Sequence, residues 1–140
     1  MRARVSPLLL TLVLVSSCTA QGAWDLFRDL AHGDRDRPGD RWFDDAWSRR
    51  HRLSFLNSGL GALTDFPLLV VLTNARVDYA ATAAGGTDLR FVDADTAEVL
   101  DYEIERWTSG GTSYVWVKVP RIDAGSIDDR IWLYYGNPGT

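Results

Sequence analysis

The sequence has few of the residues that form disulfide scaffolds or metal centres. Its 140 residues contain one cysteine and two histidines. A single cysteine excludes an intramolecular disulfide framework. The two histidines, His32 and His51, lie in unrelated contexts that do not make a metal site. We therefore predict a domain that is stabilised by its hydrophobic core alone and holds no metal or other cofactor.

The chain also lacks a surplus of positive charge. It has 15 Lys and Arg against 19 Asp and Glu, a formal net charge of -4, and Lys118 is its one lysine. Nucleic-acid binding needs a basic surplus or stripe, so no nucleic-acid partner is expected. The sequence offers no Ser-His-Asp set, no phosphate-binding glycine loop and no Cys/His metal spacing. We predict on these absences that the protein is not an enzyme.

Long apolar runs are missing except near the N-terminus. Arg2 and Arg4 precede an apolar run over residues 8–15, which is too short for a membrane-spanning helix of about 20 residues and is typical of a signal peptide. The run ends at Val15-Ser16-Ser17-Cys18, which resembles the lipobox of bacterial lipoproteins. The resemblance implies cleavage before Cys18 and lipidation of its thiol. The alternative is an ordinary secretory signal cut near Ala20.

A lipid on Cys18 is the expected contact with the membrane. A diacylglycerol and an amide-linked acyl chain, at about 0.8 kcal/mol per buried CH2, make such an attachment effectively permanent. Thr19 rather than Asp follows the cysteine, which by resemblance to the sorting rule of Gram-negative lipoproteins indicates the outer membrane. We expect residues 1–17 to be the signal peptide and residues 18–46 to be the lipidated N-terminus and a charged linker. Within it, residues 33–41 alternate both charge signs with breakers and have nothing to bury, so we predict that they are solvated.

From residue 47 onward the hydrophobic period is two, which is typical of β-strands. Alternating or continuous apolar stretches occur at 53–55, 67–72, 89–91, 100–104, 115–119 and 131–135. Turn signals such as Gly85-Gly86 separate them, and only residues 75–84 look briefly helical. About seven strands in about 90 residues predict an all-β fold, an antiparallel, jelly-roll-like β-sandwich over residues 47–140.

Several short blocks of this segment are distinctive. They are Trp47 with Arg49-Arg50, Asp65-Phe66-Pro67, Asp88-Leu89-Arg90-Phe91, Tyr102-Glu103-Ile104-Glu105 with Trp107, Val115-Trp116-Val117-Lys118-Val119-Pro120, and Tyr134-Tyr135-Gly136-Asn137-Pro138. In order and spacing they resemble the bacterial domain-of-unknown-function family 2341, over residues 47–138. The resemblance implies a compact β domain of exported proteins, often placed before a concanavalin A-like or laminin G-like sandwich, and no established reaction. Thr140 follows the last block directly, so either the domain works alone on its tether or the chain is the front part of a longer protein.

Three carboxylates mark one predicted strand. Asp101, Glu103 and Glu105 alternate with apolar residues and share a face, with neighbours about 6 to 7 Å apart. This spacing is compatible with the paired carboxylates of a glycoside hydrolase. The interpretation we favour is a solvated strand face balanced by basic residues across the sheet, because no second acid-base cluster supports catalysis.

Three aromatic residues alternate with aliphatic ones near the C-terminus. Trp116, Trp132 and Tyr134 lie on the strand faces opposite the aliphatic set, and if those faces are exposed they form a platform on which sugar rings stack. Core packing is the alternative, because Trp is highly buried on average. With Glu103 and Glu105 as further candidate ligand-binding residues, we expect a non-catalytic module that binds cell-surface polysaccharide or glycan. The alternatives are a structural or protein-interaction module of an envelope complex, and a glycoside hydrolase fragment that uses the two glutamates.

Overall fold

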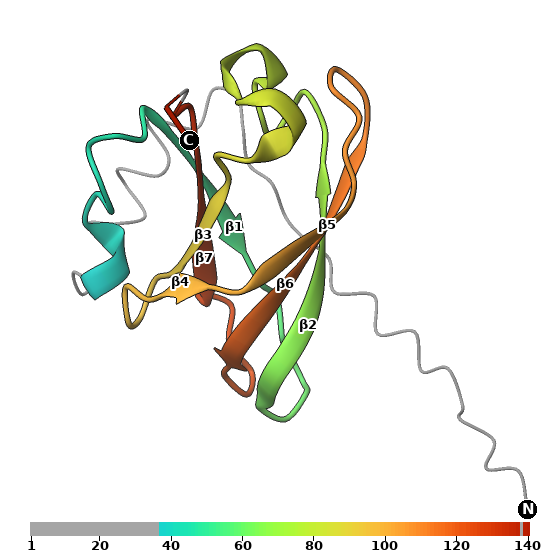
Figure 1. Cartoon of the computed structure of the whole chain (residues 1–140). Coiled ribbons are helices and arrows are strands. Elements are labelled where there is room, and N and C mark those ends of the chain that lie inside the picture. Colours follow the sequence, from blue (N-terminus) through green and yellow to red (C-terminus); the bar gives the residue numbers. More distant parts are fainter. Residues whose placement is uncertain (1–36, 138) are drawn as a thin grey trace, which may run out of the picture.

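The computed structural model describes residues 37–137 and 139–140, which form two antiparallel β-sheets stacked face to face (Figure 1). The strands are β1 (Arg49–Ser54), β2 (Leu63–Leu72), β3 (Arg90–Asp93), β4 (Val99–Leu100), β5 (Tyr102–Arg106), β6 (Ser113–Ile122) and β7 (Arg130–Tyr135). The four-stranded sheet has the order β1-β7-β3-β4 and the three-stranded sheet the order β2-β6-β5. The predicted all-β sandwich is confirmed.

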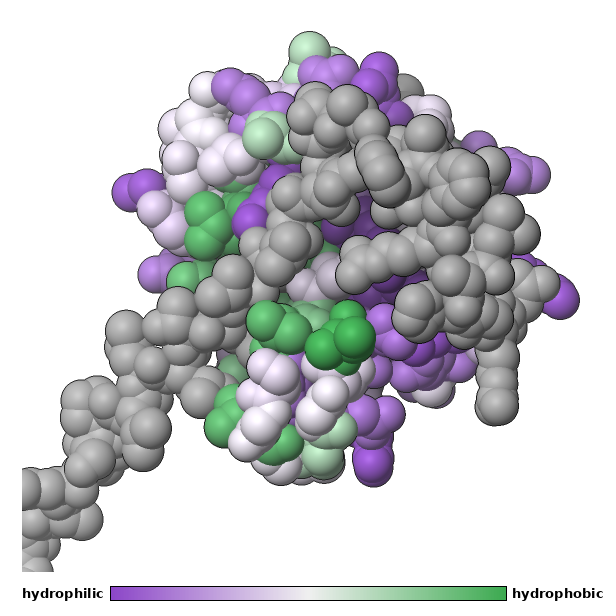
Figure 2. All heavy atoms as spheres, turned by 180° about the vertical axis from the view of Figure 1, so that it is seen from behind, coloured by the Kyte–Doolittle hydropathy of each residue, from purple (hydrophilic) through white to green (hydrophobic). Residues whose placement is uncertain are grey.

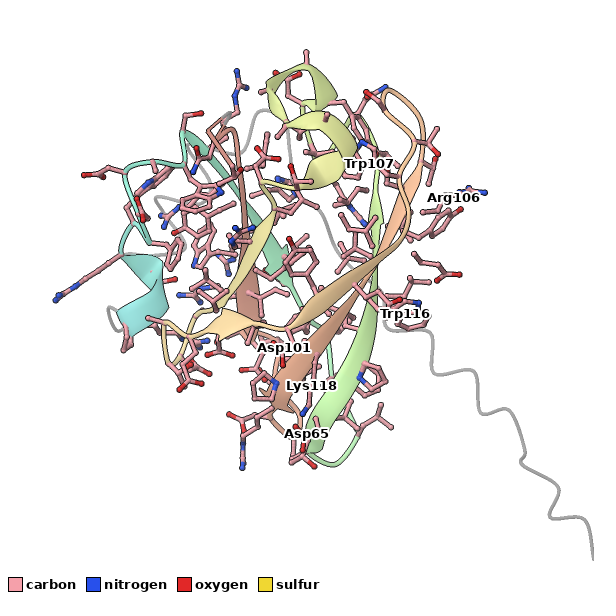
Figure 3. The ribbon with its side chains drawn as sticks, in the orientation of Figure 1. Asp65, Asp101, Arg106, Trp107, Trp116 and Lys118 are labelled. Atoms are coloured by element: carbon pink, nitrogen blue, oxygen red, sulfur yellow. The ribbon has the colours of Figure 1, made fainter. Side chains whose placement is uncertain are left out.

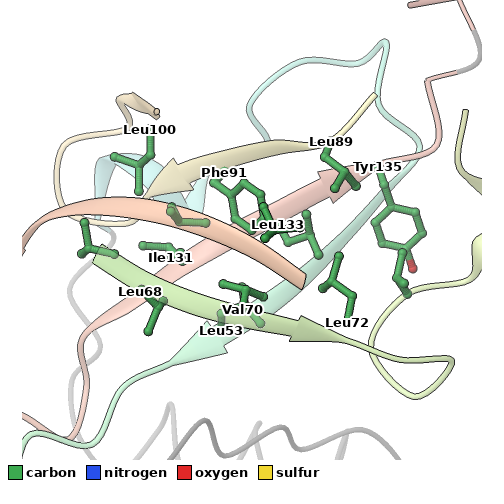
Figure 4. Close-up of a cluster of buried hydrophobic side chains, with 14 of the residues drawn as sticks. Leu53, Leu68, Val70, Leu72, Leu89, Phe91, Leu100, Ile131, Leu133 and Tyr135 are labelled. Carbon is green, nitrogen blue, oxygen red and sulfur yellow. The ribbon is translucent and has the colours of Figure 1, made fainter. Parts of the chain in front are cut away.

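Each sheet turns one side of its strands to a shared core. In β6 the alternation is strict, because Val115, Val117 and Val119 are fully buried whereas Trp116 and Lys118 are exposed. The facing sheet supplies large apolar side chains to the same cluster (Figure 4), among them Leu53, Phe91, Ile131 and Leu133. A slip of one residue would turn the valines of β6 to water, so the hydrophobic pattern specifies the register of this strand.

The prediction of a short helix at residues 75–84 is wrong, because this part of the chain forms 3-10 turns and no regular helix. The segment contains one 3-10 turn, η2 (Tyr79–Ala81), and a second, η3 (Ala84–Gly86), follows it. Tyr79 ties η2 to the sheet, because its buried hydroxyl donates to Leu72 O at 3.0 Å and lies 2.9 Å from Ser113 Oγ. Gly85 and Gly86 both have positive φ, which stops a regular helix from continuing.

The charged segment before residue 47 is not a solvated linker where the structure describes it. Residues 37–47, here called the strap, cross the outer side of the four-stranded sheet (Figure 1) and include the 3-10 turn η1 (Pro38–Asp40). Gly39 is buried, and a Cβ at its position would lie 2.1 Å from Asp93 O, so only glycine allows this approach. Phe43 packs on Trp47 and Tyr134. Packing on the sandwich therefore begins about ten residues before residue 47, because Asp40 of the strap pairs with the buried Arg130 of the sheet.

Asp40 of the strap meets a buried cation. The side chain of Arg130 in β7 is 2% exposed and forms an ion pair with Asp40, with Nε 3.1 Å from Oδ1. Trp132 donates its indole N–H to the same carboxylate at 3.0 Å. Arg50 of β1 stacks on the Trp132 ring at 3.9 Å and donates to Asp40 O at 2.9 Å. A buried charge needs such a partner, so Asp40 holds the strap on the sheet.

The edge of the three-stranded sheet that β2 forms is blocked at two points. Lys118 of β6 donates its backbone N–H to Asp101 O at 2.9 Å, on the side away from β2. Lys118 and its partner Pro67 therefore exchange no backbone hydrogen bonds, and the backbone N and C=O of Pro67 face the open edge of β2. Proline has no N–H to offer there. Four pairs further on, Arg76 donates to Val71 O at 2.6 Å and covers that carbonyl. Pairing with another strand along β2 is therefore disfavoured.

We expect Asp40→Asn to lower the free energy of unfolding by at least about 2 kcal/mol, because it removes the carboxylate that pairs with the buried charge of Arg130. Urea denaturation measures the change. The matched control is Asp78→Asn, since Asp78 pairs with Arg49 at 3.1 Å and both side chains are about half exposed. That substitution should cost less than about 1 kcal/mol. Equal losses in the two variants would contradict a central role for Asp40.

The contribution of Asp40 should depend on pH. Partial burial raises the pKa of the Asp40 carboxyl. Hydrogen bonds from Arg130 and Trp132 and the charge of Arg130 lower it by a larger amount together, so the pKa lies below its usual value. An unfolded Asp titrates near pH 3.9. The stabilisation is therefore present above about pH 4 and is lost as the pH falls through the lower pKa of the folded state. The difference in stability between the chain and Asp40→Asn should narrow in acid, and a constant difference would refute this assignment.

Candidate ligand-binding face

The outward side chains of the three-stranded sheet form the candidate site, and we call this surface the open face. Its members are Pro67, Leu69 and Val71 of β2, Tyr114, Trp116 and Lys118 of β6, and Glu103, Glu105 and Arg106 of β5. Strand pairing arranges them in rows, and Trp116 stands between Leu69 and Glu103. Trp116 is 40% exposed on the central strand. The open face thus presents an aromatic ring at its middle.

A β-bulge in β5 builds one side of the open face. Glu103 pairs with Trp116, but Arg106 rather than Glu105 pairs with Tyr114, so Glu105 is the extra residue. In a regular strand Arg106 would share the inward side of Ile104, because side chains alternate. The bulge instead places Glu105 and Arg106 next to each other on the open face, where both are exposed.

These two bulge residues orient the two aromatic rings of β6. Trp116 donates its indole N–H to Glu105 Oε2 at 2.6 Å, a hydrogen bond to a charged acceptor. The guanidinium of Arg106 lies 4.8 Å from the centre of the Tyr114 ring, a cation–π contact. Figure 3 shows Arg106 and Trp116 projecting from the sheet on the side away from the core. Both rings are held in place although they lie at the surface.

The bulge also returns the next residue to the interior (Figure 3). Trp107 packs edge-on against Tyr79, with ring centres 5.1 Å apart. Gly86 of η3 approaches the same indole, and a Cβ at its position would lie 2.6 Å from a ring atom. Trp107 therefore anchors the end of β5 in the core, which holds the bulge in its register.

The charges of the open face are unevenly matched. Lys118 forms an ion pair with Asp65 at 3.0 Å, and both side chains are exposed. Glu105 accepts from Trp116, and Arg106 covers Tyr114. Asp101 and Glu103 are exposed, and within the described residues neither carboxylate is part of an ion pair. The face therefore carries an excess of negative charge around Trp116.

The expected single platform of three aromatic residues is wrong. Trp116 lies in β6 and Trp132 and Tyr134 lie in β7, which belong to different sheets, so their outward faces point to opposite sides of the sandwich. The strap covers the second pair, and Tyr134 is completely buried. Glu103 and Glu105 do lie beside Trp116, so the structure brings together three of the five candidate residues.

Sequence reasoning missed two members of this face. Tyr114 precedes Trp116 by two residues and could have been found from the same alternation that singled out Trp116. Arg106 carries no such signal. Regular alternation places it on the inward side, and only the bulge in the folded strand brings it to Tyr114.

A second exposed surface lies at the end of the sandwich where the β1–β2 and β6–β7 loops meet. Figure 2 shows strongly hydrophobic side chains at that end, the lower one in the view. Leu56, Leu60 and Ile127 are 43%, 41% and 60% exposed on these loops. Backbone hydrogen bonds join the loops, including Asn57 N to Ser126 O at 2.9 Å. We call this surface the apolar tip.

The family comparison covers the second half of the sandwich. Residues 85–140 match the model of a domain of unknown function, DUF2341. The predicted family resemblance is confirmed over these residues. The blocks from Asp88 onward lie inside the match, and those between Trp47 and Pro67 precede it. No curated protein and no solved structure matches the chain.

Two of the DUF2341 blocks meet at one buried carboxylate. Asp88 is fully buried and accepts from Gly136 N at 2.7 Å, Asn137 N at 3.1 Å and Ala83 N at 2.9 Å. The turn after β7 is thereby fixed to the start of β3. The two blocks thus serve the fold, since a buried carboxylate needs hydrogen-bond donors and the turn after β7 supplies two of them.

Other predictions concern the N-terminus, the membrane and metal ions. Cys18 and the signal peptide lie outside the described residues. Within the described part, no helix has the length and hydropathy needed to span a bilayer. Residues 37–137 and 139–140 also contain no group of three or more His, Cys, Asp or Glu side chains placed to bind a metal ion.

We expect Glu105→Ala to release the indole of Trp116 without unfolding the sheet. The N–H proton of Trp116, identified by its absence from the NMR spectrum of Trp116→Phe, should move upfield when its charged acceptor is removed. The free energy of unfolding should fall by less than about 1 kcal/mol, because the bond is exposed. Glu103→Ala, on the same strand, should leave the signal in place. An unmoved signal in Glu105→Ala would show that this hydrogen bond does not orient Trp116.

Proposed function

We propose that this sandwich is a non-catalytic module that binds polysaccharide on its open face. The observation that carries the proposal is the placement of Trp116, which is 40% exposed at the middle of a sheet and has its indole held by Glu105. A fixed aromatic plane suits the apolar C–H face of a pyranose ring. Because the ring is already oriented, little side-chain entropy is lost on binding.

The surroundings of the ring suit a sugar chain. Leu69 flanks Trp116 on one side and Glu103 on the other. Apolar contact on one side and hydrogen-bond acceptors on the other match a ring with apolar faces and hydroxyl edges. The rows continue to Tyr114 and Val71, so the face extends beyond Trp116 along the strands.

The same placement argues for binding rather than hydrolysis. A glycosidase needs one carboxyl group whose environment keeps it protonated as a general acid. Glu103 and Glu105 are exposed on the outside of a sheet, and Glu105 already accepts from Trp116. The proposal therefore assigns these carboxylates to ligand orientation. Loss of polysaccharide turnover in Glu103→Gln would favour the hydrolase alternative.

The proposed setting is an exported lipoprotein held at the outer membrane through Cys18. Eighteen residues lie between Cys18 and Arg37, the first described residue, and they span at most about 65 Å when extended. The strap and the open face belong to opposite sides of the sandwich. A tether that enters through the strap thus leaves the open face directed away from its attachment. Mass spectrometry that finds no acyl group on Cys18 would reject the anchor.

The apolar tip favours a second candidate function, docking to a protein of the cell envelope. Three exposed aliphatic side chains on joined loops form a surface of the kind that protein partners bury. In this case Ile127→Ser should abolish co-purification of an envelope protein, whereas Trp116→Ala should leave it unchanged.

We expect Trp116→Ala to weaken polysaccharide binding at least about tenfold, because a central tryptophan contributes about 2 kcal/mol or more to a binding surface. Calorimetric titration with soluble neutral polysaccharides measures the loss. Trp42→Ala is the matched control, since Trp42 is 42% exposed but lies on the strap. It should leave the affinity unchanged. Equal affinity in the chain and Trp116→Ala would remove the open face from the proposal.

A further inference from the structure

Electrostatics give the open face a selectivity that the aromatic ring alone does not. A ring of any sugar stacks on Trp116, so stacking does not distinguish neutral sugars from charged ones. The side chains beside the ring do distinguish them. Glu103 is the cross-strand neighbour of Trp116 in β5, and Glu105 binds the indole itself. Two carboxylates therefore border the position that a stacked ring would occupy.

The cations of the face do not offset these carboxylates. Lys118, two residues after Trp116 in β6, forms an ion pair with Asp65 at 3.0 Å. Arg106 lies over the ring of Tyr114. Asp101 precedes Glu103 by two residues and adds a further exposed carboxylate on the same side. The potential at Trp116 is consequently negative.

On the basis of the proposed function, we infer that the open face selects sugars by charge, and that it prefers amino sugars to neutral ones and neutral ones to acidic ones. A protonated amino group next to a pyranose ring can pair with Glu103 while the ring covers Trp116, and the indole adds a cation–π attraction. A uronate or sulfate at the same position faces two carboxylates. The affinity for an acidic sugar should therefore fall by about as much as an amino group raises it.

The test uses sugar hexamers that share one backbone and differ in charge. Cellohexaose is neutral, chitosan hexamer carries amino groups, and cellouronic acid hexamer carries carboxylates, and all three are β-1,4-linked glucose derivatives. Calorimetric titration of the full chain at low salt should give the tightest binding for the chitosan hexamer, about threefold tighter than for cellohexaose. The uronate should bind about threefold more weakly than cellohexaose. The preference for the amino sugar should decline as salt is added.

Variants connect the selectivity to one side chain. Glu103→Gln should bring the chitosan hexamer to the affinity of cellohexaose and leave cellohexaose within about twofold of its original value. Glu98→Gln is the matched control, because Glu98 is exposed in the turn between β3 and β4, on the other sheet. It removes the same charge and should preserve the preference.

The outcomes separate the two proposals. Equal affinity for the three hexamers, or a preference that persists in Glu103→Gln, overturns charge selection and leaves polysaccharide binding standing. Binding of none of the hexamers overturns the proposed function and this inference with it. Tighter binding of the uronate contradicts the assignment of a negative potential to the open face.

Discussion

Strand β6 can bury only one of its two sides, and most of the molecule follows from which side that is. Val115, Val117 and Val119 occupy the interior, where they meet the side chains of the other sheet. Because side chains alternate along a strand, this choice leaves Tyr114, Trp116 and Lys118 on the outside. The aromatic ring at the centre of the open face is a consequence of the valine stripe behind it. The hydrophobic core and the candidate site are two sides of one strand.

The two outer surfaces of the sandwich differ because only one of them contains a buried charge. Arg130 in β7 is almost fully enclosed, and it needs an anionic partner that the sheet itself does not supply. Asp40 provides it and brings the strap over Trp132 and Tyr134. No comparable demand exists on the three-stranded sheet, whose outward charges are exposed. One aromatic set thus becomes part of the structure, and the other remains available to a ligand.

The open face depends on an irregularity as well as on alternation. The bulge at Glu105 sets a carboxylate against the indole of Trp116 and a guanidinium over Tyr114, and Trp107 secures it from inside. Bulges weaken strand pairing locally, so their position next to a candidate site is informative. Here the weakened pairing affects the edge strand β5, so the bulge that brings Arg106 to the open face disturbs only its pairing with β6.

The class of fold and most strand positions can be predicted from the sequence, because a two-residue hydrophobic period is typical of strands that bury one side. The sequence also named Trp116, Glu103 and Glu105 as candidate ligand-binding residues, since alternation within a strand is local information, but alternation alone does not tell which side of a strand faces solvent. The position of Trp132 and Tyr134 on the opposite side follows from the folded chain, because sheet membership depends on pairing between distant strands. The same holds for Asp40, whose partner Arg130 is 90 residues away. Arg106 joined the site only through the bulge, since a one-residue change of register leaves no trace in the hydrophobic pattern.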